Sequence, residues 1–268
     1  MSPTDAVILG LVQGLTEFLP VSSSGHLVIV ERVLGLQSAD LSFPVAVHIG
    51  TLVAVLIYFR HRIAAIVTAC TSSLSYGHSR ETSGSSPKDD RLMVLFVLIG
   101  SIPAGVIGVL FKDQIEMAFA APFAAALCLM VTGLWLLATG PIRPGTRPVG
   151  WWRAWWIGVA QAIAIIPGIS RSGSTIATGM MLGVEPSQAA EFSFLLSIPA
   201  VFGATLLSIP DALRAGRFGP AHIIGLVVAA LTGYLALRLV FATIRHGRFA
   251  WFGVYCLFAG GAAAIWLR

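Results

Sequence analysis

The chain has 268 residues, of which 56% are hydrophobic and 11% are charged, whereas a soluble globular domain carries roughly 25% charged residues. This composition excludes a soluble enzyme or binding domain and indicates an integral membrane protein. The formal net charge is +5, but the basic residues cluster in short loops between apolar segments, a pattern that sets membrane topology and does not predict a nucleic-acid partner.

Six apolar segments are long enough to cross a bilayer, because each crossing needs about 20 helical residues at a rise of 1.5 Å per residue. They cover residues 43–59, 92–111, 122–139, 192–209, 221–244 and 249–267. Residues 1–5 lack the basic stretch of a cleavable signal peptide. The three cysteines lie far apart without paired histidines, so we interpret them as small apolar side chains.

Two further apolar runs, 6–19 and 154–166, have about 14 and 13 residues and give roughly 20 Å of helix, whereas the hydrocarbon core is about 30 Å thick. Each is broken by proline and glycine with serines nearby, and each resumes as a short apolar piece at 27–36 and 175–183. We predict two re-entrant helical hairpins. Irregular backbone at that depth is tolerated only where protein or a water-filled cavity surrounds it.

The two hairpins resemble each other, because Gln13 and the serine run 22–25 recur 148 residues later as Gln161 and the run 170–173. This indicates an internal repeat. The alternative is chance similarity between two turns of small residues. We expect a single all-α polytopic membrane domain, 1–268, whose halves are approximately 1–140 and 141–268.

Charge predicts the orientation of the chain. The loops near 60–91, 143–153 and 245–248 hold ten Lys and Arg residues on one side of the predicted topology, against five on the other, which makes the first side cytoplasmic. The two halves then have opposite topology, and the hairpin tips should meet near the bilayer midplane, where inverted-repeat transporters place substrate sites. Residues 71–90 are expected to form a flexible cytoplasmic loop.

Chemistry in the first hairpin begins with Gln13 and Glu17, which lie four residues apart on one face of a helix that ends at Pro20. A carboxylate in an apolar run is a candidate general base, proton carrier or metal ligand. The alternative is an acid that only hydrogen-bonds a neighbouring helix.

The serines after the break can bind phosphate oxygens together with free backbone N–H groups, or they can simply cap a helix. His26 follows at once, and its proximity to Glu17 across the turn favours a catalytic role over a structural one. The other histidines, which have no such neighbours in the sequence, are His48, His61, His78, His222 and His246.

The second hairpin supplies Arg171 within the run 167–175, where a guanidinium can pair with a phosphate or form an ion pair with Glu17. A carboxylate, serines, a histidine and an arginine thus converge, which is the combination needed to grip and cleave a phosphate ester or anhydride on a lipid. A divalent cation shared between Glu17 and diphosphate oxygens would offset like-charge repulsion.

At these residues the sequence resembles the undecaprenyl-diphosphate phosphatase family, the bacitracin-resistance type of integral membrane enzyme. Two motifs carry the resemblance, the (E/Q)-x-x-x-E run with its following serines, glycine and histidine at 13–26, and the Pro-Gly-x-Ser-Arg-Ser-x-x-Thr run at 167–175. Together they are highly specific, and the similarity in length, hydropathy and order of segments covers nearly the whole chain.

The resemblance implies removal of the terminal phosphate from undecaprenyl diphosphate, with Mg²⁺ or Ca²⁺, at a site that opens to the periplasmic face of the bacterial inner membrane. It implies that Glu17 is the essential acid and tentative metal ligand, that Ser23 and His26 belong to the catalytic cluster, and that Arg171 binds phosphate. The nucleophile is His26, a serine or water. A homodimer is compatible with the sequence. The remaining motif residues, expected to bind the substrate phosphates, are Gln13, Ser22, Ser24, Gly168, Ser170, Ser172 and Thr175.

Gln13 occupies a position where the family pattern also allows glutamate, so a mechanism with two acids there is disfavoured. The type 2 phosphatidic-acid phosphatase superfamily is the nearest rival enzyme class, but its lysine-rich first motif and the histidine after Ser-Arg are missing from the sequence. A lipid flippase or transporter is the rival from another class, because inverted repeats with broken helices are common in transporters.

Overall fold

The computed structural model describes the chain apart from residues 37–41, 72–86, 120 and 216–218. Its described residues form twelve helices and no β-strand, so the all-α prediction is confirmed for them. The helices are α1 (Pro3–Phe18), α2 (Ser23–Val33), α3 (Ser42–Tyr58), α4 (Arg60–Thr71), α5 (Pro87–Leu110), α6 (Lys112–Phe119), α7 (Pro122–Leu137), α8 (Trp151–Ile163), α9 (Arg171–Met181), α10 (Pro186–Ala215), α11 (Pro220–Arg245) and α12 (Trp251–Trp266).

Each of the six predicted apolar segments coincides with a helix: α3, α5, α7, α10, α11 and α12. Among the described residues, three helical stretches are long and apolar enough to cross a membrane, namely Lys88–Leu110, Pro186–Ser208 and Pro220–Arg245. The number becomes five if α3 with α4, and α6 with α7, each count as one bent span. Large apolar side chains such as Phe258, 79% exposed, and Ile265, 77% exposed, cover the outside, as expected of a multi-pass membrane protein.

Two predicted loops are helical instead. α4 lies within the expected loop 60–91, and α6 lies between two predicted spans. Neither contains Gly or Pro, and Arg62 of α4 forms ion pairs with Asp90 on α5 and Glu191 on α10, which tie α4 to the bundle. The predicted loop 71–90 is helical at Thr71, the end of α4, and at 87–90, the first turn of α5, while its residues 72–86 lie outside the described part.

The helix pair α1–α2 recurs as α8–α9 with a constant offset. α1 and α8 begin at residues 3 and 151, and α2 and α9 run over 23–33 and 171–181, so each of these three bounds differs by 148. Close packing follows the same offset, because a Cβ on Gly10 of α1 would meet α11 backbone at 2.8 Å, and one on Gly158 of α8 would meet α5 backbone at 2.2 Å. Two independent features therefore favour a repeat over chance similarity.

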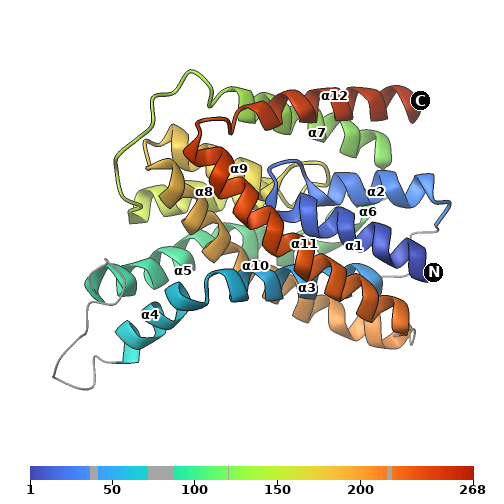
Figure 1. Ribbon diagram of the computed structural model, residues 1–268, viewed down its shortest axis with the longest axis horizontal. Helices are drawn as coiled ribbons and strands as arrows, with labels where there is room; N and C mark the ends of the chain where they lie inside the picture. The colour runs from blue at the N-terminus through green and yellow to red at the C-terminus, as the bar shows by residue number, and fades with distance from the viewer. Residues whose placement is uncertain (37–41, 72–86, 120, 216–218) are drawn as a thin grey trace.

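The arrangement of the pairs can be followed in Figure 1, where α1 and α2 lie to the right, α8 and α9 to the left, and α11 crosses diagonally. The helices α7 and α12 run side by side along the top. Their contact depends on glycine, because a Cβ on Gly133 would lie 2.8 Å from the carbonyl oxygen of Gly253, and one on Gly253 would lie 2.6 Å from that of Gly133. Small residues are the usual means of close helix packing in lipid.

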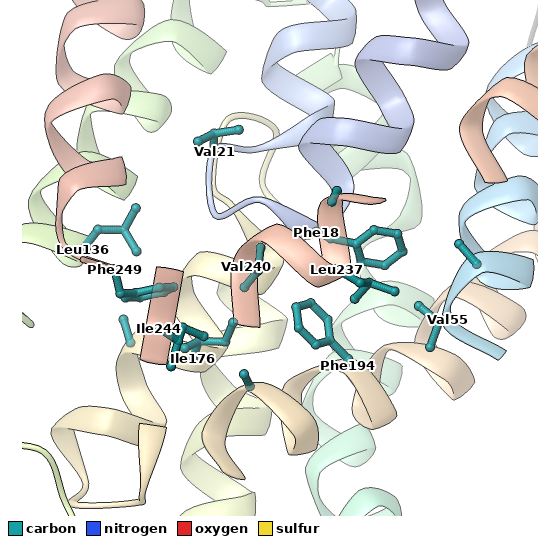
Figure 2. Packing of buried hydrophobic residues seen from close by; sticks show 14 of the residues in the cluster. Phe18, Val21, Val55, Leu136, Ile176, Phe194, Leu237, Val240, Ile244 and Phe249 are labelled. Atoms are coloured by element: carbon teal, nitrogen blue, oxygen red, sulfur yellow. The ribbon is translucent and has the colours of Figure 1, made fainter. Parts of the chain in front are cut away.

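The main hydrophobic cluster includes Phe18 and Val21, which lie on either side of Pro20 between α1 and α2. Figure 2 shows Phe18, Leu237 and Phe194 of α1, α11 and α10 pointing toward one another. The rings of Phe18 and Phe194 meet edge to face with centroids 5.8 Å apart. Because Phe18 is almost completely buried there, the cluster fixes the position of the preceding residue, Glu17.

Candidate active site

Glu17 lies at the carboxyl end of α1, one helical turn after Gln13. The Gln13 Nε2 donates to Glu17 Oε2 at 3.1 Å, which confirms that the two residues share a helix face. Gln13 is fully buried and Glu17 is 8% exposed. A carboxylate buried this deeply needs compensating hydrogen bonds or a counter-ion.

The first compensation comes from the start of α2. The chain turns back through Ser22, which has φ 67° and is the only non-glycine residue with positive φ in the described ranges. Ser22 caps α2 by accepting from the Gly25 N–H at 3.3 Å, and the next residue, Ser23, donates its hydroxyl to Glu17 Oε2 at 2.6 Å. The left-handed backbone at Ser22 is energetically unfavourable, and such strain concentrates at functional sites.

The second compensation comes from α9. Arg171, its first residue, donates from Nη2 to Glu17 Oε1 at 2.6 Å, and the side chains are 15% and 8% exposed. The ion pair considered from the sequence therefore forms. The second terminal nitrogen of the guanidinium, Nη1, is buried without a hydrogen-bond partner among the described residues. The arginine thus keeps one donor unused beside the carboxylate.

The two helix pairs meet directly at their turns. The N–H of Gly168 donates to Ser24 Oγ at 3.3 Å, and Ser172 Oγ donates to the carbonyl oxygen of Leu19 at 3.2 Å. Gly168 has φ 91°, and a Cβ there would lie 2.1 Å from the backbone oxygen of Ala125. Only glycine fits this position.

The serine clusters of the two turns are geometric copies of each other. Ser22 and Ser170 cap α2 and α9, and each also lies 3.3 Å from the hydroxyl two residues later, Ser24 or Ser172. The helix-cap interpretation is therefore confirmed for Ser22, and Ser170 caps α9 in the same way. Because the first residues of both helices bond Glu17, two positive helix ends converge on one carboxylate, and helix N-termini favour bound anions.

His26 is not paired with Glu17 in the described structure. Its Nδ1 donates to the carbonyl oxygen of Ser22 at 2.8 Å, so Nε2 is the acceptor, and the Tyr255 hydroxyl donates to it at 2.8 Å. The rings of His26 and Tyr255 stack with centroids 5.7 Å apart. The ring contacts of His26 therefore lie with the cap of α2 and with α12, and no hydrogen bond joins it to Glu17 among the described residues.

Thr175, expected at the phosphate site, is fully buried between α9 and α10. Its hydroxyl bonds the Arg171 carbonyl oxygen at 2.7 Å and the hydroxyl of Ser193 at 2.5 Å. Thr175 therefore stabilises the backbone of Arg171, and no hydrogen bond joins it to Glu17 in the described structure.

Sequence reasoning missed His48 of α3. Its Nδ1 donates to the Pro44 carbonyl oxygen at 2.7 Å, and its Nε2 lies 4.0 Å from Glu17 Oε2, a distance at which a protonated ring forms an ion pair with the carboxylate. His48 has no polar neighbour of this kind in the sequence, and only the fold brings it near Glu17. The available signal was an imidazole within a predicted membrane span, where polar side chains are costly.

Thr132 of α7 was also missed. Its hydroxyl donates to the Gly168 carbonyl oxygen at 3.1 Å and accepts from the Ser170 N–H at 3.0 Å. It thereby fixes the backbone that presents Arg171. A lone threonine in an apolar run gives no signal of this role, because its hydroxyl usually bonds its own helix.

A preformed all-protein metal centre is not found, because no three His, Cys, Asp or Glu side chains cluster within the described ranges. Oxygen ligands are nevertheless available. Gln13 Oε1 is a buried acceptor that lacks a partner in the part of the chain described, and it lies beside Glu17. Hard divalent cations bind through a few protein oxygens together with substrate phosphates, so the residues present fit such an ion.

Comparison with known proteins gives a consistent result. Residues 6–262 match the family model described as bacitracin resistance protein BacA. The chain is 41% identical over 278 residues to the undecaprenyl-diphosphatase of Desulfosudis oleivorans, covering all of this chain and 99% of that protein. It is 40% identical over 270 residues to the undecaprenyl-diphosphatase of Salinibacter ruber, covering 98% of each.

Proposed function

This chain belongs to the bacitracin resistance protein BacA family, and we propose that it is an undecaprenyl-diphosphate phosphatase. It cleaves the phosphoric anhydride of undecaprenyl diphosphate and gives undecaprenyl phosphate and inorganic phosphate. This recycles the lipid carrier for peptidoglycan and other cell-wall polymers and confers resistance to bacitracin. The names of these relatives, which are undecaprenyl-diphosphatases, favour hydrolysis over the flippase alternative.

The observation that carries this proposal is the Glu17–Arg171 pair at the meeting point of two helix N-termini. An arginine with one unused, buried donor can exchange its carboxylate partner for a phosphate, which it binds with similar geometry. The converging N-termini of α2 and α9 add to the attraction for an anion. In the empty state Glu17 holds the guanidinium in place, and in the bound state the terminal phosphate replaces it.

Glu17 would then be free to act as the general base. Ser23 already donates to it at 2.6 Å, which is the geometry of a nucleophile, or of a group that orients a water, held by its base. His26 has both nitrogens occupied by Ser22 and Tyr255, so the contacts favour Ser23 or water over His26 as the attacking group. The attacking oxygen bonds the terminal phosphorus as the anhydride P–O bond breaks, undecaprenyl phosphate leaves, and Glu17 takes the proton. When water attacks, inorganic phosphate forms directly; when Ser23 attacks, water then hydrolyses the phosphoserine and releases inorganic phosphate.

The expected Mg²⁺ or Ca²⁺ would be held by Glu17 and the unpartnered Gln13 Oε1, with diphosphate oxygens completing its shell. The ion would neutralise charge on the substrate. Gln13 contributes an oxygen and not a second carboxylate, so one acid supplies all the basic chemistry in this motif. Ser24, Ser170, Ser172 and Gly168 position the two turns around the phosphates.

We further propose six membrane spans and two re-entrant hairpins, α1–α2 and α8–α9, in halves of opposite topology. The 148-residue offset of the hairpins and the excess of Lys and Arg on one side support this arrangement. The site would open to the periplasmic face of the inner membrane. A cysteine replacing Lys88 should react with an impermeant maleimide only from the cytoplasmic side; labelling from outside intact cells would invert the topology.

The test of the activity is phosphate release from undecaprenyl diphosphate by purified protein in detergent with Mg²⁺ or Ca²⁺, where no second compartment exists. We expect turnover by the wild type and none by Glu17→Gln. Absence of release by the wild type with either ion would refute the proposed function, whereas equal release by Glu17→Gln would refute only the assigned site.

A further inference from the structure

An apolar cavity of about 510 Å³ lies between α5, α6 and α8, away from the Glu17–Arg171 pair. Ligand pockets in proteins commonly measure roughly 300–1,000 Å³. The described residues that line it are all apolar or aromatic: Ile102, Pro103, Val106, Ile107, Ile115, Trp155, Val159, Ala162, Ile163, Ile165 and Ile166.

The cavity ends at the turn that carries the proposed phosphate site. Ile165 and Ile166 line it and belong to the segment between α8 and α9, and Arg171 follows Ile166 by five residues. Since an extended chain spans at most about 3.6 Å per residue, the Cα atoms of Ile166 and Arg171 are within roughly 18 Å of each other. One short segment therefore has the cavity at one end and the phosphate-binding guanidinium at the other.

The chemistry of the lining selects an apolar occupant. A polar headgroup would find no hydrogen-bonding side chain among the described lining residues, which makes its burial there costly. The walls are also accessible from the bilayer, because Ile102 is 51% exposed, Val106 49% and Ile166 45%. A lipid chain can therefore enter sideways without leaving the hydrocarbon region.

The repeat shows what distinguishes this side of the molecule. Ile165 and Ile166 occupy the positions that correspond, 148 residues earlier, to Glu17 and Phe18. Before the α1–α2 turn, the Glu17 carboxylate pairs with the guanidinium of Arg171, whereas at the equivalent positions after α8 two isoleucines line the cavity. An amphiphile with an anionic head and an apolar chain matches this division.

We propose that this cavity holds isoprenoid units beyond the first one of the lipid diphosphate substrate, while its diphosphate lies at Arg171. The assignment rests on the proposed phosphatase function and extends it to substrate selectivity. The segment 165–171 joins the cavity to Arg171, which favours the substrate's own chain over a bulk phospholipid chain as the occupant. The cavity would then determine which lipid diphosphates bind productively at Arg171.

The test narrows the cavity with Val159→Trp on α8 and, from the opposite wall, Val106→Trp on α5. The matched control is Leu11→Trp, at the repeat position equivalent to Val159, 39% exposed on α1 and not part of the described lining. For each purified variant, kcat and KM are measured in detergent with undecaprenyl diphosphate and with isopentenyl diphosphate, whose five carbons are too few to fill the cavity.

We expect each cavity variant to raise KM for undecaprenyl diphosphate about tenfold, which corresponds to ~1.4 kcal/mol, with kcat/KM for isopentenyl diphosphate and both values for Leu11→Trp unchanged. Wild-type KM for undecaprenyl diphosphate in both cavity variants would overturn the inference. An equal loss of kcat/KM on both substrates would also overturn it, because such a loss would not depend on the length of the lipid chain. Inactivity of the wild type on both substrates would instead refute the proposed function.

Discussion

Glu17→Gln removes one charge and little volume, so its effect on stability isolates the buried ion pair. The wild-type carboxylate accepts from Gln13, Ser23 and Arg171, and the Arg171 side chain is only 15% exposed. Without the carboxylate, the guanidinium stays buried with no counter-ion, and its Nη1 already lacks a partner among the described residues. Removing one partner of a buried pair costs about 3–5 kcal/mol, and we expect that loss here.

The assay is a double-mutant cycle with Glu17→Gln, Arg171→Met and the combined variant, followed by thermal unfolding in one detergent. The combined variant should recover much of the lost stability, since no charge remains buried alone, yet it should release no phosphate. Asp113→Asn, which removes an exposed charge on α6, serves as the control and should change stability by a few tenths of a kcal/mol.

Two outcomes would refute this reasoning. If Glu17→Gln unfolds at the wild-type temperature, the pair does not stabilise the fold by the amount derived from its burial. If the combined variant regains phosphate release together with stability, Glu17 and Arg171 are structural residues, and the catalytic group lies elsewhere.

Three further substitutions test the turn that presents the arginine. Gly168→Ala forces a Cβ to 2.1 Å from backbone at φ 91°, so it should destabilise the protein by at least about 1–3 kcal/mol, while Gly105→Ala, with open space around it, should not. Thr132→Val leaves a buried N–H and C=O of that turn unpaired. It should lower the free energy of unfolding, measured by denaturation, by about 1–3 kcal/mol per group. Tyr255→Phe removes the donor to His26, and kcat should fall about fivefold, as for the loss of a hydrogen bond of ~1 kcal/mol; an unchanged kcat would show that this hydrogen bond does not contribute to turnover.

Much of the fold follows from local signals in the sequence. Pro20 favours the end of a helix before it, and the small residues at 22–25 and at 168, 170, 172 and 173 permit the turns and close approaches that the structure shows. The six long apolar runs could form helices only, because every backbone group in lipid must be hydrogen-bonded internally. α4 and α6 escaped prediction because their sequences are less apolar and were interpreted as loops.

The charged residues of the site could be predicted from the sequence, whereas the residues that hold them in position could not. A carboxylate and a guanidinium in apolar surroundings require each other, so Glu17 and Arg171 could be paired across 154 residues of sequence. Thr132 and Tyr255 carry no such requirement. Both are ordinary residues of apolar helices, and only the fold shows that their hydroxyls form hydrogen bonds with Gly168 and His26.

The repeat explains why the first motif alone is an incomplete site. Both halves supply the same scaffold, a capped helix after a turn with paired serine hydroxyls. Chemistry enters where the halves differ: position 17 is an acid and position 165 an isoleucine, while position 23 is a serine and position 171 an arginine. Ser23 and Arg171 are both first residues of their helices and both bond Glu17. The duplicated scaffold thus places a hydroxyl and a cation symmetrically about one carboxylate, which neither half could do by itself.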